Sequence, residues 1–353
     1  MPTSTPSPRA ARRSPLGLIA ALLALLALVA AACGGDDSGD DASDPTPTSE
    51  TGAAGGGASE PDLSGVTIRV GDQADEHLRQ ILELSGDLDE LPYEIEWSSF
   101  QNGPALIAAA TGGSVDIGKL SETPVVFAQA AGSPVKVVYV GAPADPSTSS
   151  LGIVVAKDSD IESVEDLAGR KVAYAPGTVL EYLLANALDQ AGLSLDDVTL
   201  VTIQPGIDLL ASGDADAMVT GDPSISTGLA GGAQRLLVSG ADYTPGYYYL
   251  IARDGLFDDP LKEAAVADLL ERIAAAEERW NADVDAAAEI LAEKSGLPVE
   301  IAKAVIERSP VRYAAPTQEN IDAHQDEIDF FVRSGVIEGD LDASAVFDLR
   351  FAG

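Results

Sequence analysis

The stretch GPALIAAATGGSVDIGKLSETPVVFAQAAG, residues 103 to 132, decides how this chain folds. Its pattern predicts a helix, a Gly-rich turn, a short strand, the polar loop 119–123 and a second helix. That helix begins at Pro124, because proline has the preset φ of a first helical turn. The loop thus joins the end of a strand to the start of a helix. Ligands of open α/β sheets collect at such places, since unpaired N–H groups of the helix converge there.

The same pattern returns further along the chain. Gly113-Ser-Val-Asp116 followed by Pro124 is echoed by Gly213-Asp-Ala-Asp216 followed by Pro223. We expect Asp116 and Asp216 at turns or strand edges, where short acidic side chains bond to nearby backbone. The repeat predicts two similar lobes that face one cleft.

Strand and helix patterns alternate from residue 66 to residue 252, which predicts an α/β fold with mainly parallel sheets covered by helices. A Pro/Ser-rich crossing at 142–150 interrupts the alternation. We therefore assign residues 64–148 and 247–353 to lobe 1, and residues 149–246 to lobe 2. Two crossings between lobes make a hinge that suits closure around a ligand.

Helical spacing dominates after the last predicted strand. Residues 261–281 read as one long helix, and three further helices are expected up to about residue 334. We expect this helical C-terminal tail to pack against lobe 1.

The N-terminus has the pattern of an export signal. Arg9, Arg12 and Arg13 precede an apolar run from residue 16 to residue 32, and that run is shorter than the ~20 residues of a membrane span. Residues 1–32 are therefore expected to be removed as a signal peptide. Residues 33–63, rich in Gly, Ser, Thr, Pro and Asp, are expected to form a disordered tether.

Ala30-Ala-Ala-Cys33 resembles the lipobox of bacterial lipoproteins. The resemblance implies that Cys33 is lipidated and anchors the protein to the outer face of the cell membrane, an extracytoplasmic location. A plain secretory signal and an uncleaved anchor helix stay open as alternatives.

Composition excludes several classes of protein. The formal net charge of −36 repels nucleic acid, so no nucleic-acid partner is expected. The single cysteine excludes a disulfide framework and a thiolate metal site. The two histidines, His77 and His324, lie far apart without motif neighbours, which argues against triad or zinc-hydrolase chemistry. We expect no cofactor, no metal and no catalytic residue.

Several segments, taken in order, resemble the substrate-binding proteins of ABC importers for aliphatic sulfonates, taurine and nitrate, and their relatives for thiamine-pyrimidine precursors. The segments that carry this resemblance are residues 100–107, 113–118, 123–132, 138–141, 164–173, 187–193, 213–217, 222–223 and 248–253.

The resemblance implies a periplasmic-binding-protein-like fold of type II, in which two lobes close like a flytrap on a small solute. It implies a monomer that delivers the solute to an ABC permease with its ATPase, and it implies no enzymatic activity.

The family's pocket positions carry over in part to this sequence. The first-lobe candidates are Asp72, Gln73, Asn102, Ser121, Glu122 and Thr123, and the second-lobe candidates are Gly177, Thr178, Glu181, Gly221 and Asp222. Tyr247 is added because a tyrosine there could stack on a planar ligand.

The departures from the family bear on the ligand. Val179, Leu180 and Glu181 replace a run of hydroxyls, and Asp72 adds an acid, so we expect a more acidic cleft than a sulfonate needs. A neutral or cationic nitrogen-containing ligand and a sulfonate both stay open. Glu122 and Asp222 also suit a purely structural role beside a helix N-terminus.

Two other functions stay open as alternatives. One is an enzyme on the same fold, using a carboxylate pair such as Glu122 with Asp222. The other is a tethered sensor that has lost transport. The chain cannot itself be the permease or the ATPase, because it has one apolar run at most and no phosphate-binding Gly-x-x-x-x-Gly-Lys-Ser/Thr loop.

Overall fold

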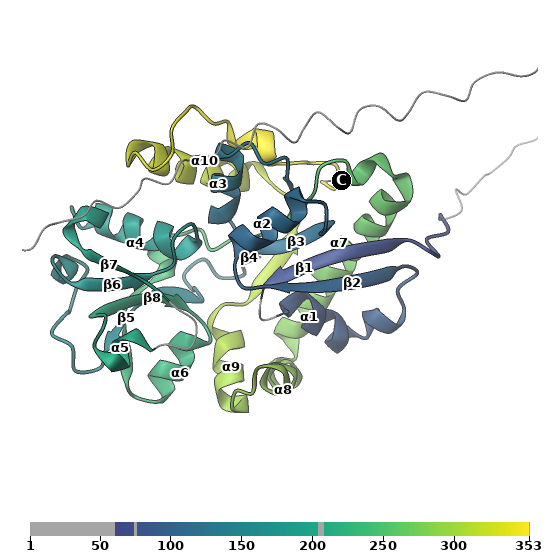
Figure 1. Ribbon diagram of the computed structural model, residues 1–353. Helices are drawn as coiled ribbons and strands as arrows, with labels where there is room; N and C mark the ends of the chain where they lie inside the picture. Colours follow the sequence, from purple (N-terminus) through teal and green to yellow (C-terminus); the bar gives the residue numbers. More distant parts are fainter. Residues whose placement is uncertain (1–60, 74–75, 204–207, 353) are drawn as a thin grey trace, which may run out of the picture. The chain divides into compact units, whose positions relative to one another are not determined.

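The computed structural model describes residues 61–73, 76–203 and 208–352. The expected signal peptide, Cys33 and nearly all of the tether lie outside these residues. The described chain forms two β-sheets with helices packed on them, an α/β fold (Figure 1).

The first sheet has six strands in the order β11-β4-β10-β3-β1-β2. These are β1 Thr67–Gln73, β2 Glu94–Phe100, β3 Ile117–Ser121, β4 Lys136–Pro143, β10 Tyr248–Ala252 and β11 Val311–Ala314. Strands β2, β1 and β3 pair in parallel, whereas β10 is antiparallel to both β3 and β4. The edge strand β11 is antiparallel to β4.

The second sheet has five strands in the order β7-β6-β8-β5-β9. These are β5 Leu151–Ala156, β6 Lys171–Tyr174, β7 Thr199–Thr202, β8 Ala217–Gly221 and β9 Gln234–Ser239. Strands β7, β6 and β8 are parallel, and β5 is antiparallel to β8 and to β9. The expectation of mainly parallel sheets is therefore wrong, since both sheets are mixed. The pattern of apolar residues indicates which strands are buried, but it does not indicate whether a strand pairs in parallel or antiparallel with its neighbours.

The chain passes from the first sheet to the second between β4 and β5, and returns between β9 and β10. The division of the chain into lobe 1 and lobe 2, with its boundaries, stays a prediction. Strands β9 and β11 were not predicted from the sequence. Strand β11 is only four residues long and lies inside the helical tail, so its alternation is too short to separate from the helical pattern around it.

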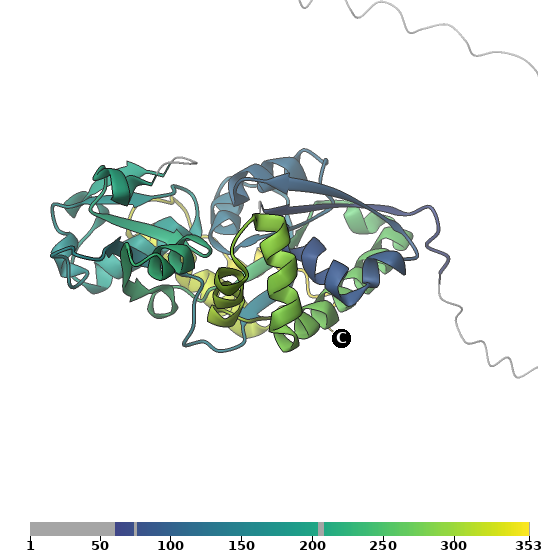
Figure 2. The same cartoon turned by 90° about the horizontal axis from the view of Figure 1, so that it is seen from below.

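Helices cover both sheets (Figures 1 and 2). Those between or after strands of the first sheet are α1 His77–Ser85, α2 Gly103–Thr111, α3 Thr123–Ala130, α7 Pro260–Ala282, α8 Val284–Ser295, α9 Val299–Arg308 and α10 Gln318–Arg333. Those of the second are α4 Val179–Gln190, α5 Leu209–Ser212 and α6 Ser224–Ala230. The tail splits around the first sheet: α10 packs against α3, whereas α8 packs against α1. The predicted helical tail is confirmed.

The internal repeat is visible in backbone bonding. The Asp116 amide donates to the Arg69 carbonyl, and the Arg69 amide donates to an Asp116 carboxylate oxygen. Asp216 and Lys171 exchange the same two bonds in the second sheet. The two aspartates therefore hold equivalent turns, as their position in the sequence predicts.

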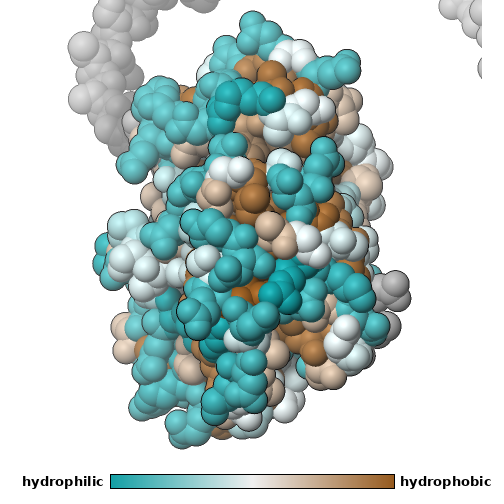
Figure 3. All heavy atoms as spheres, turned by 90° about the vertical axis from the view of Figure 1, so that its left-hand side faces the viewer, coloured by the Kyte–Doolittle hydropathy of each residue, from teal (hydrophilic) through white to brown (hydrophobic). Residues whose placement is uncertain are grey.

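Apolar side chains fill the layers between sheets and helices, and few large ones reach the surface. Among the described residues, the large apolar side chains that are well exposed are Leu200, Leu261, Val299, Val336 and Leu349. In Figure 3, polar residues cover most of the face shown, and apolar atoms appear in separate places. No helix of the described chain combines the length and the apolar character that a membrane crossing needs.

Candidate ligand-binding cavity

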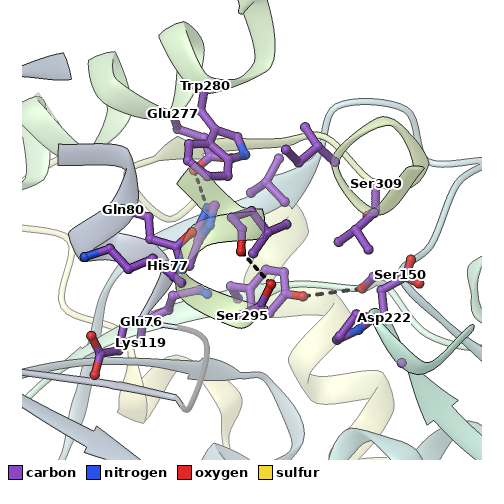
Figure 4. A pocket seen from close by; sticks show the side chains of 18 of the residues that line it. Glu76, His77, Gln80, Lys119, Ser150, Asp222, Glu277, Trp280, Ser295 and Ser309 are labelled. Carbon is purple, nitrogen blue, oxygen red and sulfur yellow. Dashed lines mark hydrogen bonds and ion pairs between the residues drawn. The ribbon is translucent and has the colours of Figure 1, made fainter. Parts of the chain in front are cut away.

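A cavity of about 560 Å³ is lined by residues from both halves of the fold (Figure 4). Helices α1, α7, α8 and α9 and strands β3, β10 and β11 supply one part of its wall. Ser150, Leu151, Gly221, Asp222 and Pro223, at the ends of second-sheet strands, supply the other. Cavities of ~300–1,000 Å³ suit drug-sized ligands, so this one is large enough for a small solute.

Lys119 and Asp72 form one charged part of the cavity region. Both side chains are buried, and Lys119 Nζ lies 3.9 Å from Asp72 Oδ1. The same ammonium lies 4.7 Å from the centre of the Tyr248 ring, a cation–π contact. The Asp72 carboxylate also accepts the backbone N–H groups of Gln73 and Leu78, both at 2.7 Å. Asp72 therefore holds the start of α1, and Lys119 offsets its negative charge.

His77 and Glu277 form a second acid–base pair on the cavity wall. His77 Nε2 lies 2.7 Å from Glu277 Oε2, and Glu277 is only 2% exposed. The imidazole also meets Trp280 edge to face, with the ring centres 5.4 Å apart. Helix α7 thus positions both the carboxylate and the indole against the first turn of α1.

Asp222 and Arg308 form a third pair, which joins the two halves of the fold. Asp222 follows β8, Arg308 ends α9, and Arg308 Nε lies 2.9 Å from Asp222 Oδ2. Within the part of the chain that the structure describes, neither atom has a hydrogen-bond partner, so the contact is an ion pair. Asp222 Oδ1 accepts the Ser226 N–H at 2.8 Å. Burial raises the pKa of Asp222, and Ser226 and Arg308 offset only part of that rise.

These three pairs make the cavity less acidic than the sequence suggests. Each buried carboxylate beside it faces a basic side chain. Figure 4 shows Asp222 and Ser150 across the cavity from His77 and Gln80. Within the described chain, no group of three His, Cys, Asp or Glu side chains is placed to hold a metal ion.

Of the residues expected to bind ligand, Gly221 and Asp222 line this cavity. Asn102 and Thr178 instead cap helices. Asn102 Oδ1 accepts the Ala105 N–H at 3.0 Å, and Thr178 Oγ1 accepts the Leu180 N–H at 3.2 Å. The two capped helices, α2 and α4, belong to different halves of the fold.

Gly177 and Glu181 complete the cap of α4. The Gly177 N–H donates to Glu181 Oε2 at 2.6 Å, and Gly177 has a φ of +69°, which a side chain would strain. A Cβ at Gly177 would lie 3.8 Å from Pro104 Cγ. The starts of α2 and α4 therefore meet, but their residues are not among those that line the cavity.

The loop from Ser121 to Thr123 faces helix α10 rather than the cavity. Ser121 ends β3, and the Thr123 hydroxyl donates to Glu327 Oε1 at 2.5 Å. Glu122 is buried, and burial raises its pKa to about 8. Burial and the neighbouring Glu122 together raise the pKa of Glu327 well above its usual value.

His324 belongs to the same buried polar cluster. Burial lowers its pKa to about 4, and its ring centre lies 5.7 Å from that of Tyr249. Both imidazole nitrogens and the Tyr249 hydroxyl lack a hydrogen-bond partner among the described residues.

The strand β10 contributes Tyr248 to the cavity, while Tyr247 lies beside Tyr249 with ring centres 6.5 Å apart. Successive side chains of a strand point to opposite faces, so neighbouring tyrosines meet different surroundings. The alternation alone does not say which face meets the cavity. Trp280 and Tyr313 also line it and were not expected from the sequence. Lys119 lines it as well; it belongs to the loop 119–123 where the sequence analysis expects ligands, although it was not among the candidate residues.

Comparison with known proteins agrees with this architecture. The family model described as NMT1/THI5 like matches residues 99–250. A protein of Escherichia coli K12 named "Putative aliphatic sulfonates-binding protein" is 31% identical over 285 residues, covering 78% of this chain and 86% of its own length.

Solved structures are similar as well. The periplasmic aliphatic sulphonate binding protein SsuA of Escherichia coli matches with a TM-score of 0.71 and 26% identity, covering 80% of this chain and 97% of that one. The alkanesulfonate-binding protein SsuA of Xanthomonas axonopodis pv. citri, bound to MOPS, has a TM-score of 0.73 at 24% identity. The match covers 82% of this chain and 99% of that structure.

The two mixed sheets and the cavity lined from both match the fold of these periplasmic binding proteins, so the class is that of a solute-binding protein. The chain belongs to the NMT1/THI5-like family, in the branch that contains the aliphatic sulfonates-binding proteins.

Proposed function

We propose that this protein is the extracytoplasmic solute-binding component of an ABC import system. It captures a small sulfonate-like or nitrogen-containing molecule between its two halves and delivers it to a membrane permease. The observation that carries the proposal is the cavity lined from both halves of the fold, in a chain whose relatives are named as sulfonate-binding proteins.

The charge balance of the cavity supports both ligand classes. Lys119 offers a buried cation to an anionic group. Glu277 and Asp222 offer carboxylates to an N–H group, although each already faces a basic partner. A solute with both kinds of group, or with no net charge, fits a wall of this kind because it leaves no buried charge unpaired.

Isothermal titration calorimetry distinguishes a sulfonate ligand from a nitrogen-containing one. Purified protein is titrated with taurine and alkanesulfonates, and in parallel with primary amines and aminopyrimidines. Binding of one molecule per chain by at least one class supports the proposal. Absence of binding by every compound in both classes contradicts it.

We infer that the protein binds its solute without converting it. The relatives that carry this inference are named as binding proteins. The test is to incubate a bound compound with the protein and analyse it by mass spectrometry. Recovery of a chemically changed product would favour an enzyme instead.

The proposal includes anchoring by a lipid on Cys33, a location outside the cytoplasm and a monomeric state. Mass spectrometry of the protein from membranes would detect the diacylglyceryl group on Cys33, and a Cys33→Ser variant would be released from the membrane. Presence of a permease and an ATPase gene beside this one would separate an importer from a tethered sensor.

A further inference from the structure

A second cavity, of about 180 Å³, lies beside the segment that carries the chain from β4 to β5. We name it the small cavity, and Arg308 of α9 is the one charged residue among the described residues that line it. Apolar side chains of β5, β9 and α6 form part of its wall. Its hydroxyl side chains are those of Ser147, Thr148, Ser149 and Ser239. None of these four residues lines the larger cavity, so the small cavity is a separate place in the fold.

Arg308 stands between the two cavities. It lines the small cavity, whereas its ion-pair partner Asp222 lines the larger one. The Arg308 side chain is 25% exposed, and within the described chain it makes one hydrogen bond, to the Ser226 hydroxyl at 3.4 Å. A guanidinium has five N–H donors in a rigid fork. Arg308 therefore keeps N–H donors for a further acceptor.

Two hydroxyls of the small cavity also keep their protons for a ligand. Ser149 Oγ accepts the Leu151 N–H at 3.1 Å, and Ser239 Oγ accepts the Ala241 N–H at 3.3 Å. Neither hydroxyl donates to an acceptor among the described residues, and a hydroxyl has one proton to donate. The two segments approach closely, since a Cβ at Gly240 would lie 2.9 Å from Ser149 Oγ.

The other two hydroxyls are already engaged. Ser147 donates to the Asp145 carboxylate at 2.7 Å, and Thr148 donates to the Asp145 carbonyl at 2.8 Å. Because Asp145 is exposed, water and salt screen its charge from the small cavity. The donors that remain are the Arg308 guanidinium and the hydroxyls of Ser149 and Ser239.

We propose that the small cavity binds a small oxyanion, such as sulfate or phosphate, held by Arg308, Ser149 and Ser239. The guanidinium fork matches two oxygens of such an ion, and the hydroxyls donate to the others. A single water needs about 10–15 Å³ of such space, so a cavity of about 180 Å³ has room for an ion of five heavy atoms. The site lies outside the larger cavity, and it goes beyond the capture of a solute.

An ion in the small cavity acts on the link between the two halves of the fold. The ion and Asp222 attract the same guanidinium, so the ion weakens the attraction between Arg308 and Asp222. Helix α9 is then held less firmly to the second half. The small cavity is thus a regulatory anion site beside the larger cavity.

NMR titration of the purified protein with sodium sulfate tests the proposal, with sodium chloride keeping the ionic strength constant. The amides of residues 149–151 and 239–241 should shift and saturate. The Arg308→Gln variant should lose this response, and Ser239→Ala should raise the midpoint concentration about tenfold, because each removes a donor to a charged ligand. The matched control is Ser224→Ala, which changes an exposed serine of α6 that lines neither cavity and should keep the original midpoint.

Hydrogen exchange gives a second readout, because saturating sulfate should speed exchange in residues 299–308 of the unmodified protein. Equal midpoints in Ser239→Ala and the unmodified protein, or shifts that never saturate, would overturn the anion site. Shifts confined to residues 76–80 and 119 would also overturn it, and they would place sulfate in the larger cavity, which leaves the proposed function standing. Unchanged exchange at saturation would overturn the competition with Asp222.

Discussion

At the scale of single residues, Asp116 holds three basic side chains at once. Its carboxylate lies 2.7 Å from both Arg69 and Arg253 and 3.5 Å from Lys262. Burial alone would raise the pKa of Asp116, but the hydrogen bonds from Arg69 and Arg253 outweigh it and hold the pKa well below its usual range. The charged form is therefore strongly favoured in the folded protein.

We expect Asp116→Asn to lower the free energy of unfolding by about 2–4 kcal/mol, because it leaves several partly buried cations without their counter-ion. Urea denaturation at pH 7 measures the change. Asp216→Asn is the matched control, since the equivalent aspartate of the second sheet is exposed and, among the described residues, its side chain accepts only the Lys171 amide. Equal losses in the two variants would contradict this role for Asp116.

Glu122 makes the folding stability depend on pH in the opposite direction to Asp116. Its pKa in the folded protein is raised to about 8 by burial, so the folded state binds the proton more tightly than the unfolded state. The stability contributed by the protonated form is complete below about pH 4.5 and is lost as the pH rises to about 8.

Glu122→Gln should therefore reduce the loss of stability between pH 5 and pH 8, as measured by denaturation across that range. Glu327 retains part of the dependence because burial raises its pKa as well. Asp326→Asn changes an exposed carboxylate on α10, the helix that carries Glu327, and it should leave the dependence of stability on pH unaltered. An unchanged profile in Glu122→Gln would show that Glu122 is ionised in the fold.

At the scale of elements, the Asp222–Arg308 ion pair joins helix α9 to the turn between β8 and α6. Because this pair bridges the two halves of the fold, it stabilises the arrangement in which α9 lies against the second half. Arg308→Gln removes the charge and leaves the buried Asp222 carboxylate unpaired.

We expect faster hydrogen exchange in residues 299–308 and 222–230 of the Arg308→Gln variant. Exchange rates in the rest of the chain should stay unchanged. Lys303→Gln is the control, because Lys303 pairs with Asp285 on the neighbouring helix α8 and not with the second half. If both variants exchange alike, the pair does not join the halves.

The elements also show what the sequence alone can predict. Residues 103–132 contain α2, β3 and α3, as their periodicity and Pro124 indicate. Local signals also predict the helix starts, since Asn102 and Thr178 cap α2 and α4. Short edge strands and strand direction depend on partners that are distant in sequence, so β9, β11 and the mixed pairing were missed.

The candidate site was harder to predict for the same physical reason. Asp72 and Asp222 stand out as acids in the sequence, but their charges are offset by Lys119 and Arg308 from other elements. Trp280 and Tyr313 read as core residues of the tail, and only the packing of α7 and β11 places them on a cavity wall. Local pattern cannot supply contacts of this kind.

At the scale of the whole molecule, a cavity shared by two halves implies closure around solute. Only a solute that binds the closed state better than the open one can shift that equilibrium. Small-angle scattering should therefore show a smaller radius of gyration at saturating solute than without it. Identical scattering curves at saturation would argue against a closing hinge.

The most direct test of the central claim is a hydrogen-exchange footprint of the tightest-binding compound from the calorimetric panel. We predict simultaneous protection of residues 76–80 and of Lys119 on one half and of residues 221–222 on the other, because the cavity is built from both. Protection confined to the helix starts at 102–105 and 177–181, or to one half alone, would contradict the assignment of this cavity as the binding site.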